Sequence, residues 1–316
     1  MLKRGRIMKA LVTGGAGFIG SNLVDLLIEN DWDVAVIDDL SSGKKENVNP
    51  DAVFYEMDIA SVEVRDIFEK ERPDVLFHFA AQISVSDSVR HPVHDASVNV
   101  IGTLNLLEAC VEFGVKKFIF SSSGGTVYGE VPGAPAKEDT EFNPESPYGI
   151  GKMSMEYYLK FYNSEHGLNF TSLRYGNVYG PRQDPHGEAG VVAIFCTAML
   201  DGRVPTINGD GKCMRDYVYV RDVARANLAC VDKGHNKAFN VGTGVTTDVN
   251  QIFEALKEAT GFEHQAKIGP PRPGDLKRSV LDISLAKEEL GWEPEYDLRA
   301  GMKPTVEFFK KKAEKK

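Results

Sequence analysis

The chain has 316 residues and a formal net charge of −9. Hydrophobic residues make up 42 % of it and charged residues 26 %, the balance of a globular protein with a sizeable core. The negative charge argues against general affinity for nucleic acids, and no apolar run reaches the ~18 residues of a membrane span. Four scattered cysteines lack the spacing of a zinc site or a disulfide framework, which favours a cytoplasmic protein without a bound metal.

The segment Lys9–Gly20 carries the most informative pattern of the sequence. A short apolar strand runs into Gly14, Gly17 and Gly20, and a helical pattern begins at Phe18. Glycines let the backbone turn tightly and approach a pyrophosphate closely, and the first N–H groups of the helix attract an anion. An ordinary strand–turn–helix is the plain alternative, but the elements together favour a dinucleotide site.

An acid follows at the expected place. The next predicted strand, 33–37, ends in Asp38 and Asp39, and Asp38 comes 18 residues after Gly20. A carboxylate there accepts hydrogen bonds from an adenosine ribose and repels a 2′-phosphate. The predicted cofactor is therefore NAD rather than NADP.

Short apolar runs alternate with helical patterns through the first half of the chain. The predicted strands are 9–13, 33–37, 52–56, 75–79, 117–122 and 169–174, and the predicted helices are 18–30, 61–71, 93–113 and 147–166. This alternation predicts an α/β fold with a doubly wound, parallel, Rossmann-type sheet. Ligands bind such sheets beyond the carboxyl ends of the strands.

The pattern changes after Tyr175. Residues 181–216 are rich in Gly, Pro and Asp, and helical patterns follow at 190–201, 284–290 and 299–314. We expect an NAD-binding domain over 1–176 and a smaller C-terminal α/β domain, 177–316, that binds the substrate. The short apolar run 239–241 is expected to return to the main sheet.

Tyr148 and Lys152 lie four residues apart at the start of the helix predicted at 147–166, so both side chains share one helix face. A phenol with a pKa near 10 needs a shift of ~3 units to act as a base near neutrality. One adjacent ammonium plus a nicotinamide cation could supply it. The strand before this helix ends in Ser121-Ser122-Ser123, so a hydroxyl, a Tyr and a Lys form a proton-transfer trio. The alternative is a surface tyrosine on an amphipathic helix.

Ordered motifs run along nearly the whole chain. They are Thr13–Gly20, Asp38–Leu40, Asp58–Ile59, Phe79–Gln82, Asn99 before Gly102–Thr103, Tyr148 with Lys152, Arg174–Pro181, Arg215–Val218 and Arg272–Asp275. Together they resemble the extended short-chain dehydrogenase/reductase family and, within it, the NAD-dependent nucleotide-sugar epimerases. The set is highly specific for the family and less so for the substrate.

The resemblance implies which residues bind NAD. Gly14, Gly17 and Gly20 are expected to hold the pyrophosphate, and Asp38 the adenosine ribose. Asp58 and Ile59 are expected to flank the adenine. Ala80, Gln82 and Asn99 are expected to line the nicotinamide half, with Lys152 reaching the nicotinamide ribose. The predicted cofactor-binding residues are Gly14, Gly17, Phe18, Ile19, Gly20, Asp38, Asp39, Asp58, Ile59, Phe79, Ala80, Ala81, Gln82, Asn99, Ser121, Tyr148, Lys152 and Tyr175.

The resemblance also implies a nucleotide-diphosphate clamp in the second domain. Two arginines can neutralise a diphosphate through charge-assisted bonds, and a carboxylate can take ribose hydroxyls. A surface ion pair is the alternative for each arginine. The predicted substrate-binding residues are Ser123, Tyr148, Asn177, Arg215, Arg272, Asp275 and Ser279.

The chain departs from the family pattern after the fifth predicted strand. Epimerases commonly carry Ser, two small residues and then Val-Tyr-Gly, whereas here Ser123 is followed by three residues, Gly124-Gly125-Thr126, before Val127. Counted back from the tyrosine, the catalytic position would be Gly124, which has no hydroxyl. We choose Ser123 because a strand fixes geometry better than a glycine loop does, and Ser122 and Thr126 stay open as alternatives.

The resemblance implies Tyr148, Lys152 and Ser123 as catalytic residues of a 4-epimerase, with UDP-glucose and UDP-galactose the expected pair. Such an enzyme oxidises the sugar at C4, lets the 4-keto sugar rotate and reduces it on the other face. The alternatives are a related dehydratase, decarboxylase or uronic acid epimerase, such as one for UDP-glucuronate. Dehydratases and decarboxylases carry ionisable groups where this chain has Gly124–Thr126. A non-catalytic NAD-binding protein of this fold would typically have lost the Tyr or the Lys.

The sequence also bears on the assembly of the chain and on the range of its substrates. The helices predicted at 93–113 and 147–166 carry more apolar residues than one sheet-facing stripe requires, which predicts a homodimer through them. The extra residues are Val100, Leu104, Leu107, Met153, Tyr157 and Phe161. By the resemblance, Ser279 faces the sugar's 2-substituent, where a tyrosine is typical of enzymes restricted to unacetylated sugars. We therefore expect activity on UDP-N-acetylglucosamine as well.

Overall fold

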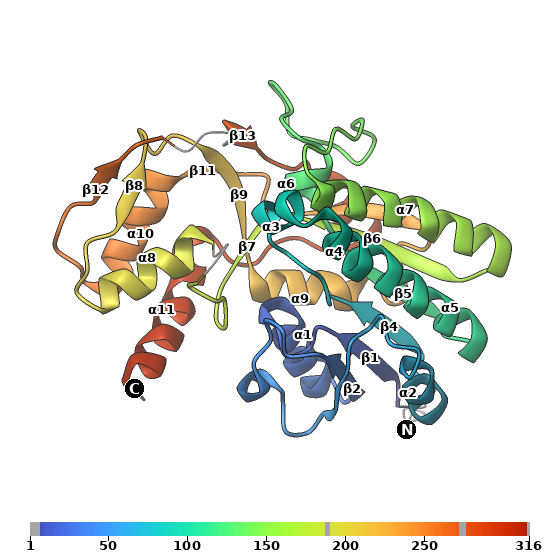
Figure 1. The fold of residues 1–316 in the computed structure, drawn as a ribbon. Coiled ribbons are helices and arrows are strands. Elements are labelled where there is room, and N and C mark those ends of the chain that lie inside the picture. Colours follow the sequence, from blue (N-terminus) through green and yellow to red (C-terminus); the bar gives the residue numbers. More distant parts are fainter. Residues whose placement is uncertain (1–6, 187–189, 272–275, 315–316) are drawn as a thin grey trace. The chain divides into compact units, whose positions relative to one another are not determined.

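The computed structural model describes residues 7–186, 190–271 and 276–314, and the chain divides into two compact units (Figure 1). Unit 1 comprises the residues up to Ser122, Ser146–Leu173 and Ala224–Ala238. Unit 2 comprises Ser123–Glu145, Arg174–Val223 and the residues from Phe239 onward.

A seven-stranded sheet is the centre of the fold, with the strand order β10-β6-β5-β4-β1-β2-β3. The strands are β1 (Lys9–Thr13), β2 (Asp33–Asp38), β3 (Val53–Glu56), β4 (Val75–His78), β5 (Lys117–Ser123), β6 (Asn169–Tyr175) and β10 (Lys237–Val241). β1 pairs in parallel with β2 and β4, and the same holds for β2 with β3 and β4 with β5. In this register Val12 lies opposite Val36 on one side and Phe77 on the other. The predicted parallel α/β sheet is confirmed.

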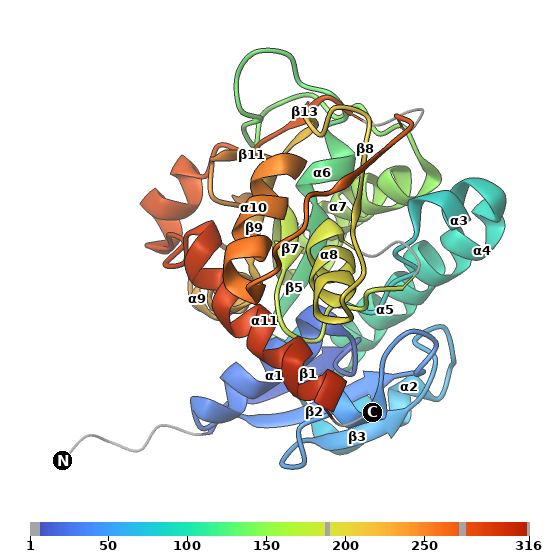
Figure 2. The same ribbon diagram turned by 90° about the vertical axis from the view of Figure 1, so that its left-hand side faces the viewer.

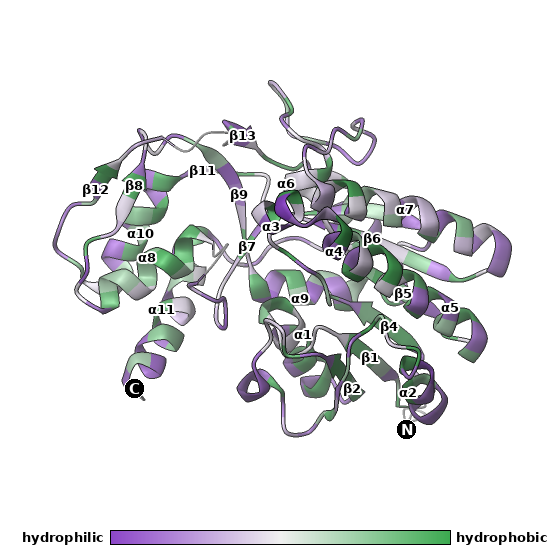
Figure 3. Cartoon of the chain, viewed as in Figure 1, coloured by the Kyte–Doolittle hydropathy of each residue, from purple (hydrophilic) through white to green (hydrophobic). Residues whose placement is uncertain are grey.

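Helices connect these strands. They are α1 (Phe18–Glu29), a 3₁₀ turn (Lys45–Asn47), α2 (Val64–Glu71), α3 (Val85–Arg90), α4 (Pro92–Ala96), α5 (Thr103–Phe113), α7 (Pro147–His166) and α9 (Val220–Ala229). Figure 2 shows β1, β2 and β3 side by side at one end of the sheet. β1, β4 and the first half of β5 carry nearly continuous buried apolar residues, which is typical of a parallel sheet covered by helices, and Figure 3 shows the green of these strands.

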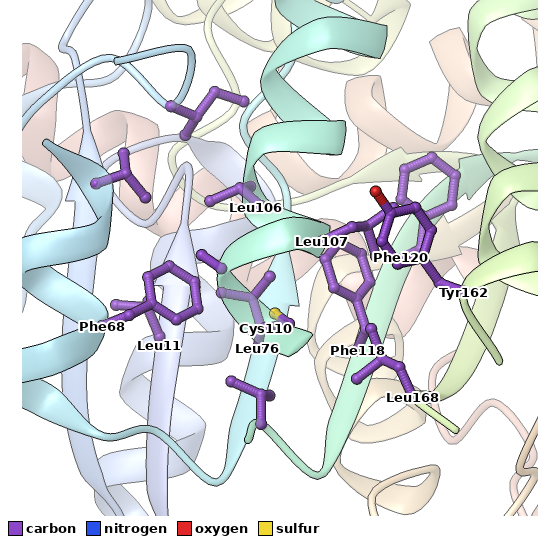
Figure 4. Close-up of a cluster of buried hydrophobic side chains, with 14 of the residues drawn as sticks. Leu11, Phe68, Leu76, Leu106, Leu107, Cys110, Phe118, Phe120, Tyr162 and Leu168 are labelled. Atoms are coloured by element: carbon purple, nitrogen blue, oxygen red, sulfur yellow. The ribbon is translucent and has the colours of Figure 1, made fainter. Parts of the chain in front are cut away.

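The core of unit 1 lies between the sheet and the helices α2, α5 and α7 (Figure 4). The sheet contributes Leu11, Leu76, Phe118 and Phe120, and the helices contribute Phe68, Leu106, Leu107, Cys110, Met155, Leu159 and Tyr162. α7 begins at the capping side chain of Ser146, followed by Pro147, and ends at Gly167 in a left-handed conformation. These ends match the predicted helix 147–166.

The helix predicted over 93–113 is not one continuous α-helix. It consists of α4, a π-helical segment at Ser97–Gly102, and α5. The wider π turn changes which side chains face the sheet, and such turns often mark functional sites. Asn99, a predicted cofactor residue, lies within it and is buried.

Unit 2 contains small sheets and helices. β9 (Met214–Tyr219) pairs with β7 (Asn177–Tyr179), β11 (Thr246–Asp248) and β13 (Arg278–Ser279), and β8 (Thr206–Asn208) pairs with β12 (Lys267–Gly269). The helical elements are α6 (Gly124–Val127), α8 (Val191–Leu200), α10 (Val249–Thr260), a π-helical segment (Ala286–Leu290) and α11 (Leu298–Glu314). No helix of the described ranges is long and apolar enough to cross a membrane.

Asp216 joins three segments of unit 2. Its buried carboxylate accepts hydrogen bonds from the backbone N–H groups of Thr243, Gly244 and Leu281, at 2.7, 3.1 and 3.3 Å. The Thr243 hydroxyl donates a further one at 2.8 Å. The aspartate of the Arg215–Val218 motif therefore holds the strand that carries Arg215 in place.

Candidate active site

The glycine loop of unit 1 is crowded in a way that only glycine allows. Gly14 has φ +71°, and a Cβ built on it would lie 2.6 Å from the backbone nitrogen of Ala80. A Cβ on Gly20 would lie 2.2 Å from the carbonyl oxygen of Gly14. Gly17, at the N-cap of α1, has no side chain to cap the helix. The first N–H groups of α1 thus face a narrow backbone cradle that suits an anion.

Asp38 holds this loop from the end of β2. Its carboxylate is buried, with Oδ2 accepting the N–H of Ala16 and Oδ1 accepting the N–H of Leu40, both at 2.9 Å. Burial raises the pKa of the Asp38 carboxyl, although these two N–H groups lower it. Asp39, by contrast, is exposed and accepts hydrogen bonds from Ser41. Asp38 therefore helps to organise the loop, and a carboxylate with four lone pairs can still accept a ribose hydroxyl.

The predicted adenine residues differ in exposure. Asp58 is exposed, and its Oδ1 accepts the N–H of Ala60 at 2.9 Å. Ile59 is buried, and a Cβ on Gly102 would lie 2.8 Å from its Cδ1. Asn105 donates to the carbonyl oxygen of Ile59 at 2.8 Å, which fixes this turn against α5.

The segment after β4 forms a polar network. The Phe79 N–H donates to the Thr13 carbonyl at 3.0 Å, which ties this segment to the glycine loop. Gln82 and Asn99 bind each other twice: the Gln82 N–H donates to Asn99 Oδ1, and Asn99 Nδ2 donates to the Gln82 carbonyl, both at 2.9 Å. Gln82 and Asn99, two of the three residues predicted for the nicotinamide half, are thus joined in the structure.

His78 is a buried residue that sequence reasoning missed. Its Nδ1 lies 2.7 Å from Thr13 Oγ1, and its Nε2 lies 2.8 Å from Thr103 Oγ1. Burial lowers the pKa of the imidazole well below its usual value, and the charge of Lys152 lowers it further. A neutral His78 therefore links the glycine loop to α5.

Tyr148 and Lys152 share one face of α7, as predicted. The Lys152 ammonium lies 5.7 Å from the centre of the Tyr148 ring and 4.9 Å from that of Phe120. Its Nζ donates to the carbonyl oxygen of Ser121 at 2.9 Å. Lys152 is only 4 % exposed, so its position at the carboxyl end of β5 is fixed by packing as well as by this bond.

In the protein without NAD, the surroundings of Tyr148 favour the neutral phenol. Burial raises the pKa of the Tyr148 phenol, and the carboxylate of Asp95 adds to the rise. Burial lowers the pKa of the Lys152 ammonium to about 8, although Asp95 raises it. Burial and the Asp95 charge therefore both oppose the phenolate that acid–base chemistry needs. A further positive charge is required to favour the phenolate.

The three candidate hydroxyls have different surroundings. Ser122 is buried and donates to Glu156 Oε1 at 2.7 Å. Ser123, the last residue of β5, is half-buried. Thr126 Oγ1 is buried without a hydrogen-bond partner among the described residues. The bond to Glu156 counts against Ser122 as a proton shuttle, so Ser123 remains our choice and Thr126 the alternative.

The predicted substrate residues that the structure describes lie in unit 2, except Tyr148. Ser279 in β13 lies opposite Arg215 in β9, so the two are register neighbours. Arg215 Nη1 donates to the carbonyl oxygens of Met214 and Leu276 at 2.9 and 2.7 Å, which leaves other guanidinium donors for an anion. Asn177 is exposed at the start of β7.

Three further residues were predicted to bind the cofactor or the substrate. Tyr175 is buried at the end of β6, in the strand that leads to Asn177. Arg272 and Asp275, predicted for the diphosphate clamp, lie outside the described residues.

Two acids near Lys152 were also missed. Glu156 lies one helical turn after Lys152, and Asp95 lies one turn before Asn99. Both carboxylates are buried beside predicted site residues, Glu156 at Ser122 and Asp95 at Asn99. The i, i+4 spacing was a usable signal in both cases.

The family model described as "NAD dependent epimerase/dehydratase family" matches residues 10–242. The chain belongs to the NAD dependent epimerase/dehydratase family. The match includes the glycine loop, Tyr148 and Lys152.

Solved structures of similar proteins extend this result. UDP-glucose 4-epimerase from Thermotoga maritima, solved with UDP-glucose, is 56 % identical with a TM-score of 0.95, covering 97 % of this chain and 100 % of that one. UDP-glucose 4-epimerase from Thermus thermophilus, solved with NAD, is 47 % identical and has a TM-score of 0.90. The match covers 96 % of this chain and 99 % of that one. UDP-N-acetylglucosamine 4-epimerase from Methanobrevibacter ruminantium, in complex with UDP-N-acetylmuramic acid, is 38 % identical and has a TM-score of 0.92. The match covers 98 % of this chain and 100 % of that one.

The residues of this family member fit its cofactor, NAD. Gly14 and Gly20 leave no room for side chains inside the pyrophosphate cradle, and Asp38 lies at the end of β2 with lone pairs for a ribose. These positions would hold NAD, which supplies a hydride acceptor.

The crowding at Gly14 gives a testable prediction. Gly14→Ala is compared with Gly114→Ala, because Gly114 also has φ +71° but no atom within 4 Å of a built Cβ. Left-handed backbone costs an alanine ~1–2 kcal/mol, so both variants should lose about that much free energy of unfolding. Gly14→Ala should lose more and should also lose bound NAD, measured by urea denaturation and by the NAD content of the purified protein. Equal NAD content in the two variants would contradict the cradle.

Proposed function

We propose that this protein is an NAD-dependent 4-epimerase that interconverts UDP-glucose and UDP-galactose. The observation that carries the proposal is the pairing of Tyr148 with a buried Lys152, in the unit that contains the glycine cradle. The 56 % identical UDP-glucose 4-epimerase supports the substrate. The proposal retains an NAD-binding part up to residue 176, a substrate-binding part after it, and a cytoplasmic location, which the scattered cysteines favour.

In this proposal the chain's own residues manage the proton and the orientation of the sugar. Tyr148 accepts the proton of the sugar 4-hydroxyl and returns it after the 4-keto sugar has rotated. Lys152 holds the nicotinamide ribose and keeps a positive charge beside the phenol. Ser123 shuttles or stabilises the proton. Bound NAD supplies the hydride acceptor and donor, and its positive charge favours the phenolate that burial opposes.

The start of α6 favours epimerisation over dehydration. A Cβ built on Gly124 would lie 2.8 Å from the Cδ atoms of Leu281, so an acid at this position would collide with the core of unit 2. Gly125 and Thr126 supply no ionisable group either. The extra acid and base that elimination needs are therefore missing from this turn.

The activity is tested with purified protein and UDP-galactose, without added NAD. We expect the wild type to form UDP-glucose. Lys152→Met should lower kcat by at least ~10²-fold, because methionine keeps most of the volume of the lysine but removes a positioned contributor to acid–base chemistry. Lys160→Met, at an exposed lysine of the same helix, serves as the control. Turnover near that of the wild type in Lys152→Met would remove the Tyr148–Lys152 pair from the mechanism.

We also propose that N-acetylated sugars are accepted. Ser279 is half-buried and lies opposite Arg215 in the parallel β13–β9 pair. It is therefore a neighbour of a residue that is predicted to bind the diphosphate of the substrate. The 38 % identical UDP-N-acetylglucosamine 4-epimerase supports this breadth. A small side chain here leaves space, and unfilled space weakens binding of the smaller hexose by only ~1–3 kcal/mol.

Substrate breadth is tested by epimerisation of UDP-N-acetylglucosamine. The wild type should convert it, and Ser279→Tyr should lose this activity while keeping that on UDP-galactose, because the ring fills the space of the acetyl group. Ser284→Tyr, at an exposed serine of unit 2, should change neither activity. If the wild type does not act on the acetylated sugar, or if Ser279→Tyr still does, the steric argument at this position fails.

A homodimer through unit 1 is the third part of the proposal. α7 exposes a stripe of Ile150, Tyr157 and Phe161, with Tyr157 57 % and Phe161 51 % exposed. Helix α4 packs against α7 and exposes Val93, and the adjoining π segment exposes Ile101. Such an apolar surface suits a second copy of the chain. The prediction for Leu107 was wrong, because this residue is fully buried in the core.

The dimer is tested by the mass in solution at micromolar concentration. The wild type should have the mass of two chains, and the double variant Tyr157→Glu/Phe161→Glu should have that of one, because buried carboxylates oppose association. Val62→Glu, at an exposed valine ahead of α2, should remain dimeric. A monomeric wild type would refute this assembly.

A further inference from the structure

Asp95 in α4 is a buried acid that no predicted motif contains. It is 1 % exposed, and its Oδ1 accepts one hydrogen bond from Gln82 Nε2 and one from Asn99 Nδ2, both at 2.9 Å. These are the two amides predicted for the nicotinamide half of NAD. A single carboxylate oxygen therefore fixes the orientation of both.

The other oxygen of Asp95 faces α7. A Cβ built on Gly151 would lie 3.7 Å from Asp95 Oδ2, and Gly151 stands between Tyr148 and Lys152 in the same turn of α7. Helices α3 and α4 lie beside α7, as Figure 1 shows. The carboxylate therefore lies within van der Waals reach of the turn that carries both predicted catalytic residues.

Asp95 interacts with charged groups of α4 and α7. Burial raises the pKa of the Asp95 carboxyl, while the hydrogen bonds from Gln82 and Asn99 and the charges of Lys152 in α7 and His94 in α4 lower it less. In return, Asp95 raises the pKa of both Lys152 and Tyr148. His78, from β4, faces Lys152 as a neutral imidazole. Away from water such charge interactions are strong.

We propose that Asp95 is a positioning residue of the epimerase reaction: its Oδ1 holds the amides of Gln82 and Asn99, and its carboxylate places a negative charge beside the turn of α7 that carries Tyr148 and Lys152. This charge favours the protonated forms of Lys152 and Tyr148 until a positive charge arrives at the site. The inference rests on the proposed function for its role in turnover, but not for its electrostatic part.

The electrostatic part is tested on the protein without turnover. Asp95→Asn keeps an acceptor for the two amides and removes the charge. Titration of Lys152, followed by NMR of labelled lysine and assigned with Lys152→Met, should give a pKa near 8 in the wild type. In Asp95→Asn it should fall by about one unit, the lower end of the effect of a nearby charge. Asp87→Asn, at a half-exposed acid of α3 paired with Arg90, should leave it unchanged. An unchanged value in Asp95→Asn would overturn the proposal.

The role in turnover is tested by the pH profile of kcat/KM on UDP-galactose. In Asp95→Asn both limbs should move to lower pH by about one unit, because Tyr148 and Lys152 each lose their protons more easily. A drop in kcat/KM at every pH without such a move would mean a purely structural role and would overturn the proposal. An inactive wild type would overturn the proposed function instead, and the lysine titration would still decide on Asp95.

A wild-type measurement covers the case in which Asp95→Asn does not fold. Carboxyl carbon NMR of the wild type should show Asp95 ionised at neutral pH, because the two hydrogen bonds that it accepts favour the carboxylate. A protonated Asp95 at neutral pH would overturn the proposal.

Discussion

The site depends on one buried cation. Lys152 is almost entirely removed from water, and an isolated ammonium in such surroundings is strongly destabilised. Three groups offset this cost: the carbonyl oxygen of Ser121, the ring face of Phe120 and the negative charge of Asp95. They do so incompletely, since the pKa of Lys152 falls to about 8. The ammonium is thus held at the carboxyl end of β5 in a protonation equilibrium close to neutral pH.

The surrounding elements hold this cation and its partners in position. α7 approaches Asp95 at Gly151, and the π turn carries Asn99 to the same carboxylate. His78 then connects the glycine loop to α5 through two threonine hydroxyls. The cofactor cradle and the Tyr148–Lys152 pair are therefore parts of one polar network in unit 1. A change in charge at one point of such a network is felt at the others.

Much of this arrangement could be predicted from sequence because it rests on local patterns. The glycine loop, the acid at Asp38 and the shared face of Tyr148 and Lys152 follow from spacing alone. Even the ends of α7 were predicted, because Pro147 and Gly167 mark them. Helix α10 was missed although Asp248 and Gln251 form a capping box at its start.

The rest depends on tertiary packing that a single sequence does not show. The sign of the pKa shift at Tyr148 is set by burial, and no spacing reveals how deeply a phenol lies. The same applies to Asp95, whose neighbours Gln82 and Gly151 are distant in the chain. The short strands of unit 2, β7, β8 and β11 to β13, were not predicted because two or three residues carry little periodicity. Arg215 is oriented by two carbonyl oxygens, one of them from Leu276, which only the fold brings near.

The central claim is that Tyr148 and Lys152 serve an oxidation at C4 that is reversed within the same protein. The most direct measurement uses UDP-galactose carrying deuterium at C4, with the purified protein in ordinary water. The account predicts UDP-glucose that keeps its deuterium at C4, because that hydrogen leaves and returns as a hydride while only the hydroxyl proton exchanges. UDP-glucose that has lost deuterium to the solvent would contradict the account.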